Sequence, residues 1–113
     1  MNSKRGGVTL KAGDQNYTVR ITTNAMVKYQ DMTAEMAEKY EGLYPDGGES
    51  FLEGIAALQT NQGDIRRMRN LFWAGVSHMD GMTPDMAGDV MDEAGFADCL
   101  EAVSESAALA FPS

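Results

Sequence analysis

Two short stretches of alternating apolar and polar residues near the beginning of the chain constrain its fold most. The apolar positions are Val8, Leu10 and Ala12 in the first stretch and Tyr17, Val19 and Ile21 in the second. The residues between them, 13–16 (Gly-Asp-Gln-Asn), are typical of a turn. The pattern predicts a β-hairpin over residues 8–22 with one apolar face. Because two strands alone are only marginally stable in water, helices must cover this face.

The next part of the chain carries apolar residues at spacings of three and four, which is typical of helices. We expect Thr23 or Asn24 to cap a first helix that weakens near residues 31–33 and is followed by an exposed loop over residues 43–49. Its apolar stripe consists of Met26, Tyr29, Thr33, Met36 and Tyr40. Ser50 and Glu53 form a capping-box pattern, which predicts a second helix from Phe51. The predicted buried side of that helix consists of Phe51, Leu52, Ile55, Ala56 and Leu58.

Three further helices complete the expected body. The third follows a cap at Asp64, and we expect it to form the centre of the core. Its predicted apolar face consists of Ile65, Met68, Leu71, Phe72, Gly75, Val76 and Met79, and the residues predicted to point outward are Arg66, Arg67, Arg69 and Asn70. Thr83 and Pro84 begin a fourth helix that Gly95 ends. A last helix from about Phe96 to Leu109 is expected to turn Phe96, Leu100, Val103 and Ala107 inward.

These elements predict an α+β fold that is mainly α. An N-terminal β-hairpin packs on a compact bundle of four to five helices. The 113 residues are expected to form a single domain, residues 1–113, with the hairpin at 8–22 and the helical body at 24–110.

The charge of the chain restricts its partners. The formal net charge is −8 and the sequence pI is about 4.4, which argues against nucleic acid and against anionic membrane surfaces. No run approaches the roughly 18 apolar residues of a membrane span. The single cysteine, Cys99, cannot form an internal disulfide, so we expect a buried thiol in the reducing cytoplasm.

The residues that could carry chemistry do not form a recognisable site. The only histidine, His78, adjoins Ser77, but neighbouring residues on a helix point in different directions and do not make a nucleophile–base pair. Zinc needs three or four Cys or His ligands, and the chain has two such residues in all. The carboxylates between residues 80 and 93 do not have the spacing of a calcium loop. We therefore expect no catalytic residues, no metal or cofactor site and no enzymatic activity.

Methionine is unusually frequent, with nine in 113 residues. Methionine fills irregular cores, and it also makes adaptable binding surfaces. The candidate protein-binding surface consists of Trp73, Met79, Met82 and Met86. The alternative is that all four side chains belong to the core, and the pattern leaves both interpretations open.

The order of several short motifs resembles a known family. The motifs are the start 5–7 (Arg-Gly-Gly), the strand 17–22 (Tyr-Thr-Val-Arg-Ile-Thr), then 71–76 (Leu-Phe-Trp-Ala-Gly-Val), 82–86 (Met-Thr-Pro-Asp-Met) and 92–95 (Asp-Glu-Ala-Gly). Together they are similar to the small tail assembly chaperone family of tailed phages and bacterial gene transfer agents. The resemblance extends from about Gly6 to Gly95.

This resemblance implies a non-enzymatic function in the cytoplasm of a bacterial host. Such chaperones bind the tape measure protein, help recruit tail tube subunits and are absent from the finished particle. Two alternatives stay open: a structural virion subunit for tail completion or head–tail joining, and a small adaptor that binds a host protein. Weak homo-oligomerisation and the source, whether phage, prophage or gene transfer agent, are also open.

Overall fold

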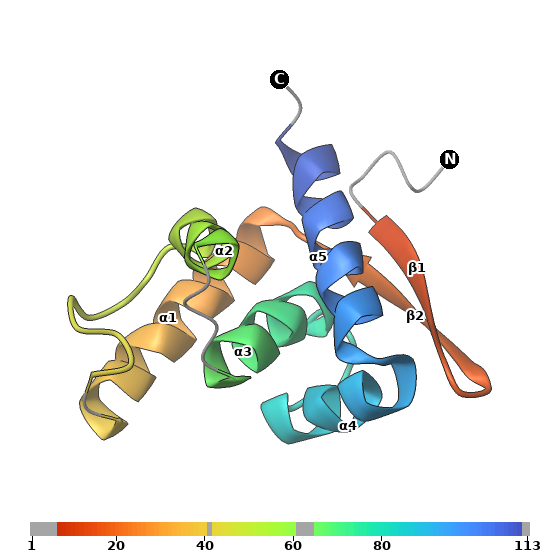
Figure 1. The fold of residues 1–113 in the computed structure, drawn as a ribbon, viewed down its shortest axis with the longest axis horizontal. Coiled ribbons are helices and arrows are strands. Elements are labelled where there is room, and N and C mark those ends of the chain that lie inside the picture. The colour runs from red at the N-terminus through yellow and green to blue at the C-terminus, as the bar shows by residue number, and fades with distance from the viewer. Residues whose placement is uncertain (1–6, 41, 61–64, 112–113) are drawn as a thin grey trace.

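The computed structural model describes residues 7–40, 42–60 and 65–111, which form two strands and five helices. The antiparallel strands are β1 (Gly7–Ala12) and β2 (Gln15–Arg20). The helices are α1 (Thr23–Lys39), α2 (Phe51–Gln59), α3 (Ile65–Val76), α4 (Pro84–Ala94) and α5 (Phe96–Ala110) (Figure 1). The predicted fold class, an N-terminal hairpin on a mainly helical body, is confirmed.

The hairpin follows from its alternating pattern. Val8 pairs with Val19 and Leu10 with Tyr17, so one face of the two strands is apolar. Leu10 and Val19 on this face are buried. Gly13 has a φ of +62°, a conformation that glycine adopts without steric strain, and this allows the tight turn. After the strands, the N–H of Ile21 donates to the Ser106 Oγ at 3.0 Å, which ties the end of the hairpin to α5.

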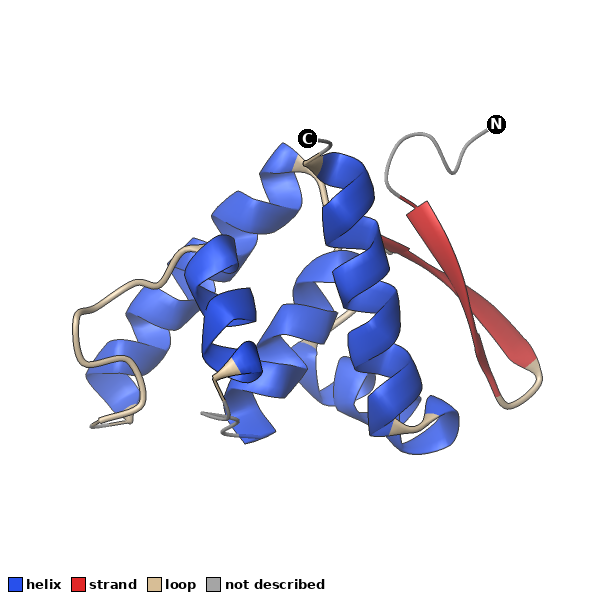
Figure 2. Ribbon diagram, turned by 45° about the horizontal axis from the view of Figure 1, so that its top comes forward, coloured by secondary structure: helices blue, strands red, loops and turns tan. Residues whose placement is uncertain are grey.

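Helix α3 lies at the centre of the molecule, as predicted. It packs against each of the other helices and against β2. Leu71, Phe72, Ala74 and Val76 on this helix are fully buried. The hairpin lies at one end of the molecule beside α5, and α1 and α2 lie at the other end (Figure 2). Every other helix is therefore positioned by its contact with α3.

The caps that set the helix starts are side-chain hydrogen bonds. Ser50 and Glu53 form the predicted capping box, with bonds of 2.9 and 3.1 Å. Thr83 Oγ1 accepts from the N–H of Met86 at 3.1 Å, as its position before Pro84 predicts. Helix α1 begins one residue earlier than expected, because Thr22 accepts from the N–H of Ala25. Asp64, the expected cap of α3, lies outside the described residues.

Several predictions about helix faces were wrong. Helix α1 runs without a break through residues 31–33, because the buried Thr33 satisfies its hydroxyl group with the Gln30 carbonyl at 2.9 Å. Leu52 on α2 and Phe96 at the start of α5 were predicted to be buried, but they are 55% and 43% exposed. Ala56 on α2 was also predicted to be buried and is exposed. Helix α2 packs chiefly on α3 and α1, so the side that carries Leu52 faces water.

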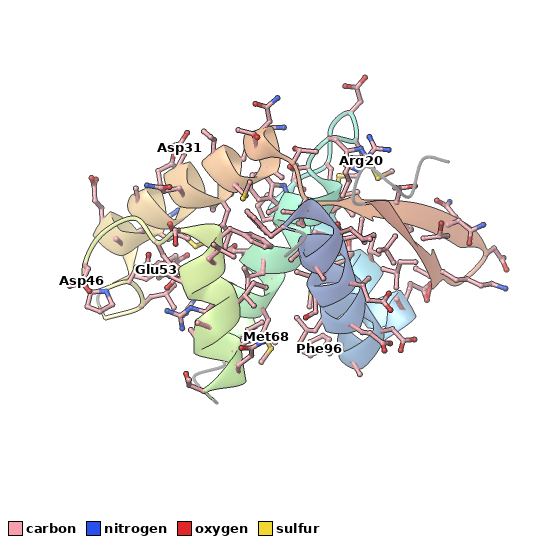
Figure 3. The ribbon with its side chains drawn as sticks, turned by 90° about the horizontal axis from the view of Figure 1, so that it is seen from above. Arg20, Asp31, Asp46, Glu53, Met68 and Phe96 are labelled. Carbon is pink, nitrogen blue, oxygen red and sulfur yellow. The ribbon has the colours of Figure 1, made fainter. Side chains whose placement is uncertain are left out.

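The segment before α2 is not a simple exposed loop. Leu43 and Tyr44 are 9% and 3% exposed, whereas Asp46 points away from the core into solvent, as does Asp31 on α1 (Figure 3). Arg67 and Asn70 on α3 were predicted to point outward and are buried as well. The reason is a polar network that joins this segment to α1 and α3, described below.

Candidate functional site

The four residues of the predicted binding surface occupy different environments. Trp73 on α3 is half-buried against the core, and its Nε1–H donates to the Met82 carbonyl oxygen at 3.2 Å. Phe72 beside it is fully buried, and because neighbouring residues on a helix point in different directions, the two rings face different sides of α3. Met79 also packs partly buried against the core. Trp73 thus holds the segment between α3 and α4 in place instead of projecting from the surface.

Met82 and Met86 line one open hollow between the hairpin and α4, which we call the hairpin–α4 hollow. Its volume is about 410 Å³, and Met86 is 47% exposed. The hollow is lined by Ala12, Asp14, Gln15, Tyr17, Met82, Met86, Asp89, Val90 and Glu93. The structure therefore brings Met82 and Met86 together in one hollow. Trp73 does not line this hollow, and it contributes by the hydrogen bond that holds the Met82 backbone.

The rim of the hairpin–α4 hollow is acidic. Asp14 lies in the hairpin turn, and Asp89 and Glu93 lie on α4; all three are exposed. None of the described residues that line the hollow is a lysine or an arginine. Within the described part of the chain, these three carboxylates make no hydrogen bond and no ion pair.

A second hollow lies on the other side of α4, between α3, α4 and α5, and we call it the α3–α4–α5 hollow. Its volume is about 650 Å³, and Ile65 and Phe96 on its wall are 52% and 43% exposed. Here the charges are mixed: Arg69 Nη1 lies 3.2 Å from Asp85 Oδ1 across the hollow. Sequence reasoning missed this hollow because it placed Ile65 and Phe96 in the core.

A buried polar network lies at the far end of α3. Arg67 donates to both carboxylate oxygens of Glu49, from Nε at 3.1 Å and from Nη2 at 2.9 Å. The Tyr29 hydroxyl donates to the same carboxylate at 2.5 Å, and the Glu49 N–H donates to Thr33 Oγ1 at 2.7 Å. The network thus fixes the segment before α2 against α1 and α3.

The electrostatics of this network follow from its burial. The hydrogen bond to Glu49 raises the pKa of Arg67, so the guanidinium stays charged. Burial, and then the hydrogen bond to Glu49, raise the pKa of Tyr29, so its hydroxyl stays protonated and acts as a donor. No local sequence signal indicates this network, because Glu49 and Arg67 lie 18 residues apart.

The residues with nucleophilic or basic side chains serve structural contacts. His78 is exposed and its Nε2–H donates to the Thr18 carbonyl oxygen at 2.8 Å, while the Ser77 hydroxyl donates to the Ala74 carbonyl at 2.8 Å. Burial raises the pKa of the Cys99 thiol to about 11, so little thiolate forms at neutral pH. No group of three or more His, Cys, Asp or Glu in the described ranges could hold a metal ion.

Comparison with known protein families, characterised proteins and solved structures gives no match to this chain. None of the described helices is both long enough and apolar enough to cross a bilayer. The function must therefore be inferred from the chain's own residues and geometry, together with the resemblance of its motifs.

Proposed function

We propose that this protein is a tail assembly chaperone of a phage or a gene transfer agent. It binds the tape measure protein during tail morphogenesis and helps recruit tail tube subunits. The observation that carries the proposal is the hairpin–α4 hollow, where Met82 and the exposed Met86 form an open apolar surface. Flexible, polarizable methionine side chains adapt to partner surfaces, and open apolar surfaces of this kind serve protein contacts.

The physical requirements of this function fit the properties of the chain. A long helical tape measure protein exposes apolar helix faces before the tail tube surrounds it. A small domain with a net charge of −8 remains soluble, and it can cover such faces by accepting an apolar helix side in a hollow. The order of motifs in the sequence supports the same function.

The proposal is tested by affinity purification with the tagged protein from cells that are assembling particles. We expect the tape measure protein to be recovered with wild type and lost with Met86→Asp. The matched control is Val27→Asp, because Val27 is also exposed (52%) but lines neither hollow. Circular dichroism checks that both variants remain folded.

Other outcomes would favour the alternatives. Mass spectrometry of purified particles that finds the protein in stoichiometric amounts, with tail-completion or head–tail components as its only partners, would replace the proposal with a structural virion subunit. Recovery of a single host enzyme or regulator, from cells with or without particle genes, would favour the adaptor.

A further inference from the structure

We propose that the hairpin–α4 hollow binds an amphipathic helix whose apolar side chains are flanked by lysine or arginine. This inference rests on the proposed function only in taking the hollow as the place where a partner protein binds. It adds the chemistry of the bound segment. The evidence is the distribution of charge around the hairpin–α4 hollow and the α3–α4–α5 hollow.

The hairpin–α4 hollow combines an apolar centre with a rim of one sign. Tyr17, Met82 and Met86 supply partly exposed apolar surface, and Val90 closes the floor. The rim carries the exposed carboxylates of Asp14, Asp89 and Glu93. A helix that inserts apolar side chains at such a centre places its flanking residues at the rim, where cations would meet the carboxylates.

The carboxylates of α4 at this rim do not stabilise the helix that carries them. Asp89 and Glu93 are four residues apart, so they lie on the same side of the helix and repel each other. Glu93 also lies in the last turn, where the helix dipole disfavours negative charge, and this turn contains no basic residue. These two carboxylates therefore do not stabilise α4, and a cation of a bound partner would offset their mutual repulsion.

Within the described hairpin, neither Lys11 nor Arg20 lines the hollow. Lys11, the basic residue of β1 nearest to the turn, is exposed and precedes Ala12, which lines the hollow. Successive strand residues point to opposite faces, so Lys11 points away from the hollow. By contrast, the α3–α4–α5 hollow contains its own cation, because Arg69 pairs with Asp85. Of these two hollows, only the hairpin–α4 hollow therefore has charged lining residues of one sign, although Asp89 lines both of them.

The fold brings the two sides of the acidic rim close together. A Cβ built on Gly13 would stand 3.5 Å from Glu93 Oε1, so the carboxylate lies directly beside the hairpin turn that carries Asp14. The hydrogen bond from Trp73 to Met82 fixes the opposite wall. The backbone of both walls is therefore set by the fold before binding, which limits the entropy that the walls lose when a helix enters.

The test uses a synthetic amphipathic peptide of about 20 residues with leucines on one face and lysines beside them, and a second peptide with glutamine in place of lysine. Binding is measured by calorimetry. We expect the lysine peptide to bind wild type and the glutamine peptide to bind at least about tenfold more weakly. Raising the salt concentration from about 50 to 500 mM should weaken binding of the lysine peptide, because salt screens the exposed charges of the rim.

Two matched variants distinguish the effect of the rim carboxylates on binding from the effect of the net charge of the protein. Asp14→Asn/Glu93→Gln removes two carboxylates of the rim, and Asp92→Asn/Glu101→Gln removes two exposed carboxylates that do not line this hollow. Both variants change the net charge equally. We expect the first to weaken binding of the lysine peptide about tenfold and to reduce its salt dependence, and the second to change affinity less than about twofold. Equal effects of the two variants, or equal affinity for the two peptides, would overturn the inference.

The same variants distinguish this inference from the proposed function. If Asp14→Asn/Glu93→Gln recovers the tape measure protein as well as wild type does, the chaperone function stands and the inference fails. If the lysine peptide binds as expected but cells assembling particles yield no tape measure protein, the inference stands and the proposed function fails.

Discussion

Glu49 organises the end of the molecule away from the candidate site. Its carboxylate receives two hydrogen bonds from Arg67 and one from Tyr29, and its N–H bonds to Thr33. The side chains of Arg67 and Glu49 are 10% and 13% exposed, so water cannot replace a lost partner easily. Such a charge pair is costly to break from one side, because the remaining charge stays buried.

We therefore expect Glu49→Gln to lower the free energy of unfolding by about 3 kcal/mol, as measured by urea denaturation. The control is Asp85→Asn, which removes the ion pair with Arg69 at a position where the Asp85 side chain is 90% exposed. This substitution should lower the free energy of unfolding by no more than about 1 kcal/mol. The double variant Glu49→Gln/Arg67→Met should be more stable than Glu49→Gln alone, because it leaves no unpaired buried charge. A cost of Glu49→Gln as small as that of Asp85→Asn would contradict this account.

Burial of this network could not be predicted from the sequence. Arginine, glutamate and asparagine are mostly exposed, so Arg67 and Asn70 were placed on the outer face of α3. Tyr44, which accepts a hydrogen bond from Asn70 Nδ2 at 3.1 Å, lies 26 residues away, and periodicity carries no information about such a partner. The same limit applies to the hollows, which form between elements that are distant in the sequence. Met82 and Met86 could be found because they flank a recognisable helix start.

At the scale of elements, the close approach of α3 to the hairpin depends on Gly75. A Cβ at this position would stand 2.6 Å from Val19 Cγ1, which is too short for two carbon atoms. We expect Gly75→Ala to lower the free energy of unfolding by about 1–3 kcal/mol, because α3 and β2 would have to separate.

Gly88 on α4 provides the matched control for Gly75. A Cβ there would meet only the Arg69 Cδ, at 3.3 Å, in a long side chain that can shift. Alanine also favours a helix by up to about 1 kcal/mol over glycine. Gly88→Ala should therefore leave the stability unchanged or slightly higher in thermal and urea unfolding. Equal losses for Gly75→Ala and Gly88→Ala would show that helix packing on the hairpin is looser than described.

Helix α4 combines the proposed binding role with a charge pattern that is unfavourable for a helix, and one substitution should separate the two effects. We expect Glu93→Lys to raise the free energy of unfolding by about 0.3–1 kcal/mol, because a cation in the last turn complements the helix dipole and no longer repels Asp89. The same change should abolish binding of the lysine peptide. Urea denaturation and calorimetry on one protein sample measure both effects. A variant that is more stable and still binds would mean that Glu93 does not face the partner.

At the scale of the whole molecule, the net charge of −8 should affect how several copies bind to the proposed long partner. Each copy presents one hairpin–α4 hollow, so a single copy gains no avidity from the length of its partner. Neighbouring copies also repel one another at low salt. A long helical partner with repeated apolar faces should therefore be covered by separate copies that bind independently.

The number of bound copies should accordingly rise in proportion to the length of a tape measure fragment, while the affinity per site stays constant. Light scattering coupled to size-exclusion chromatography gives the stoichiometry for a series of fragments, and calorimetry at low salt gives the affinity. Affinity that rises steeply with fragment length would show that neighbouring copies contact each other, which the mutual repulsion at low salt opposes. One copy bound at every fragment length would contradict a coating function, because a single small domain cannot cover a long helical chain. In that case the hollow would recognise one defined segment, and the protein would mark a position on its partner without shielding it.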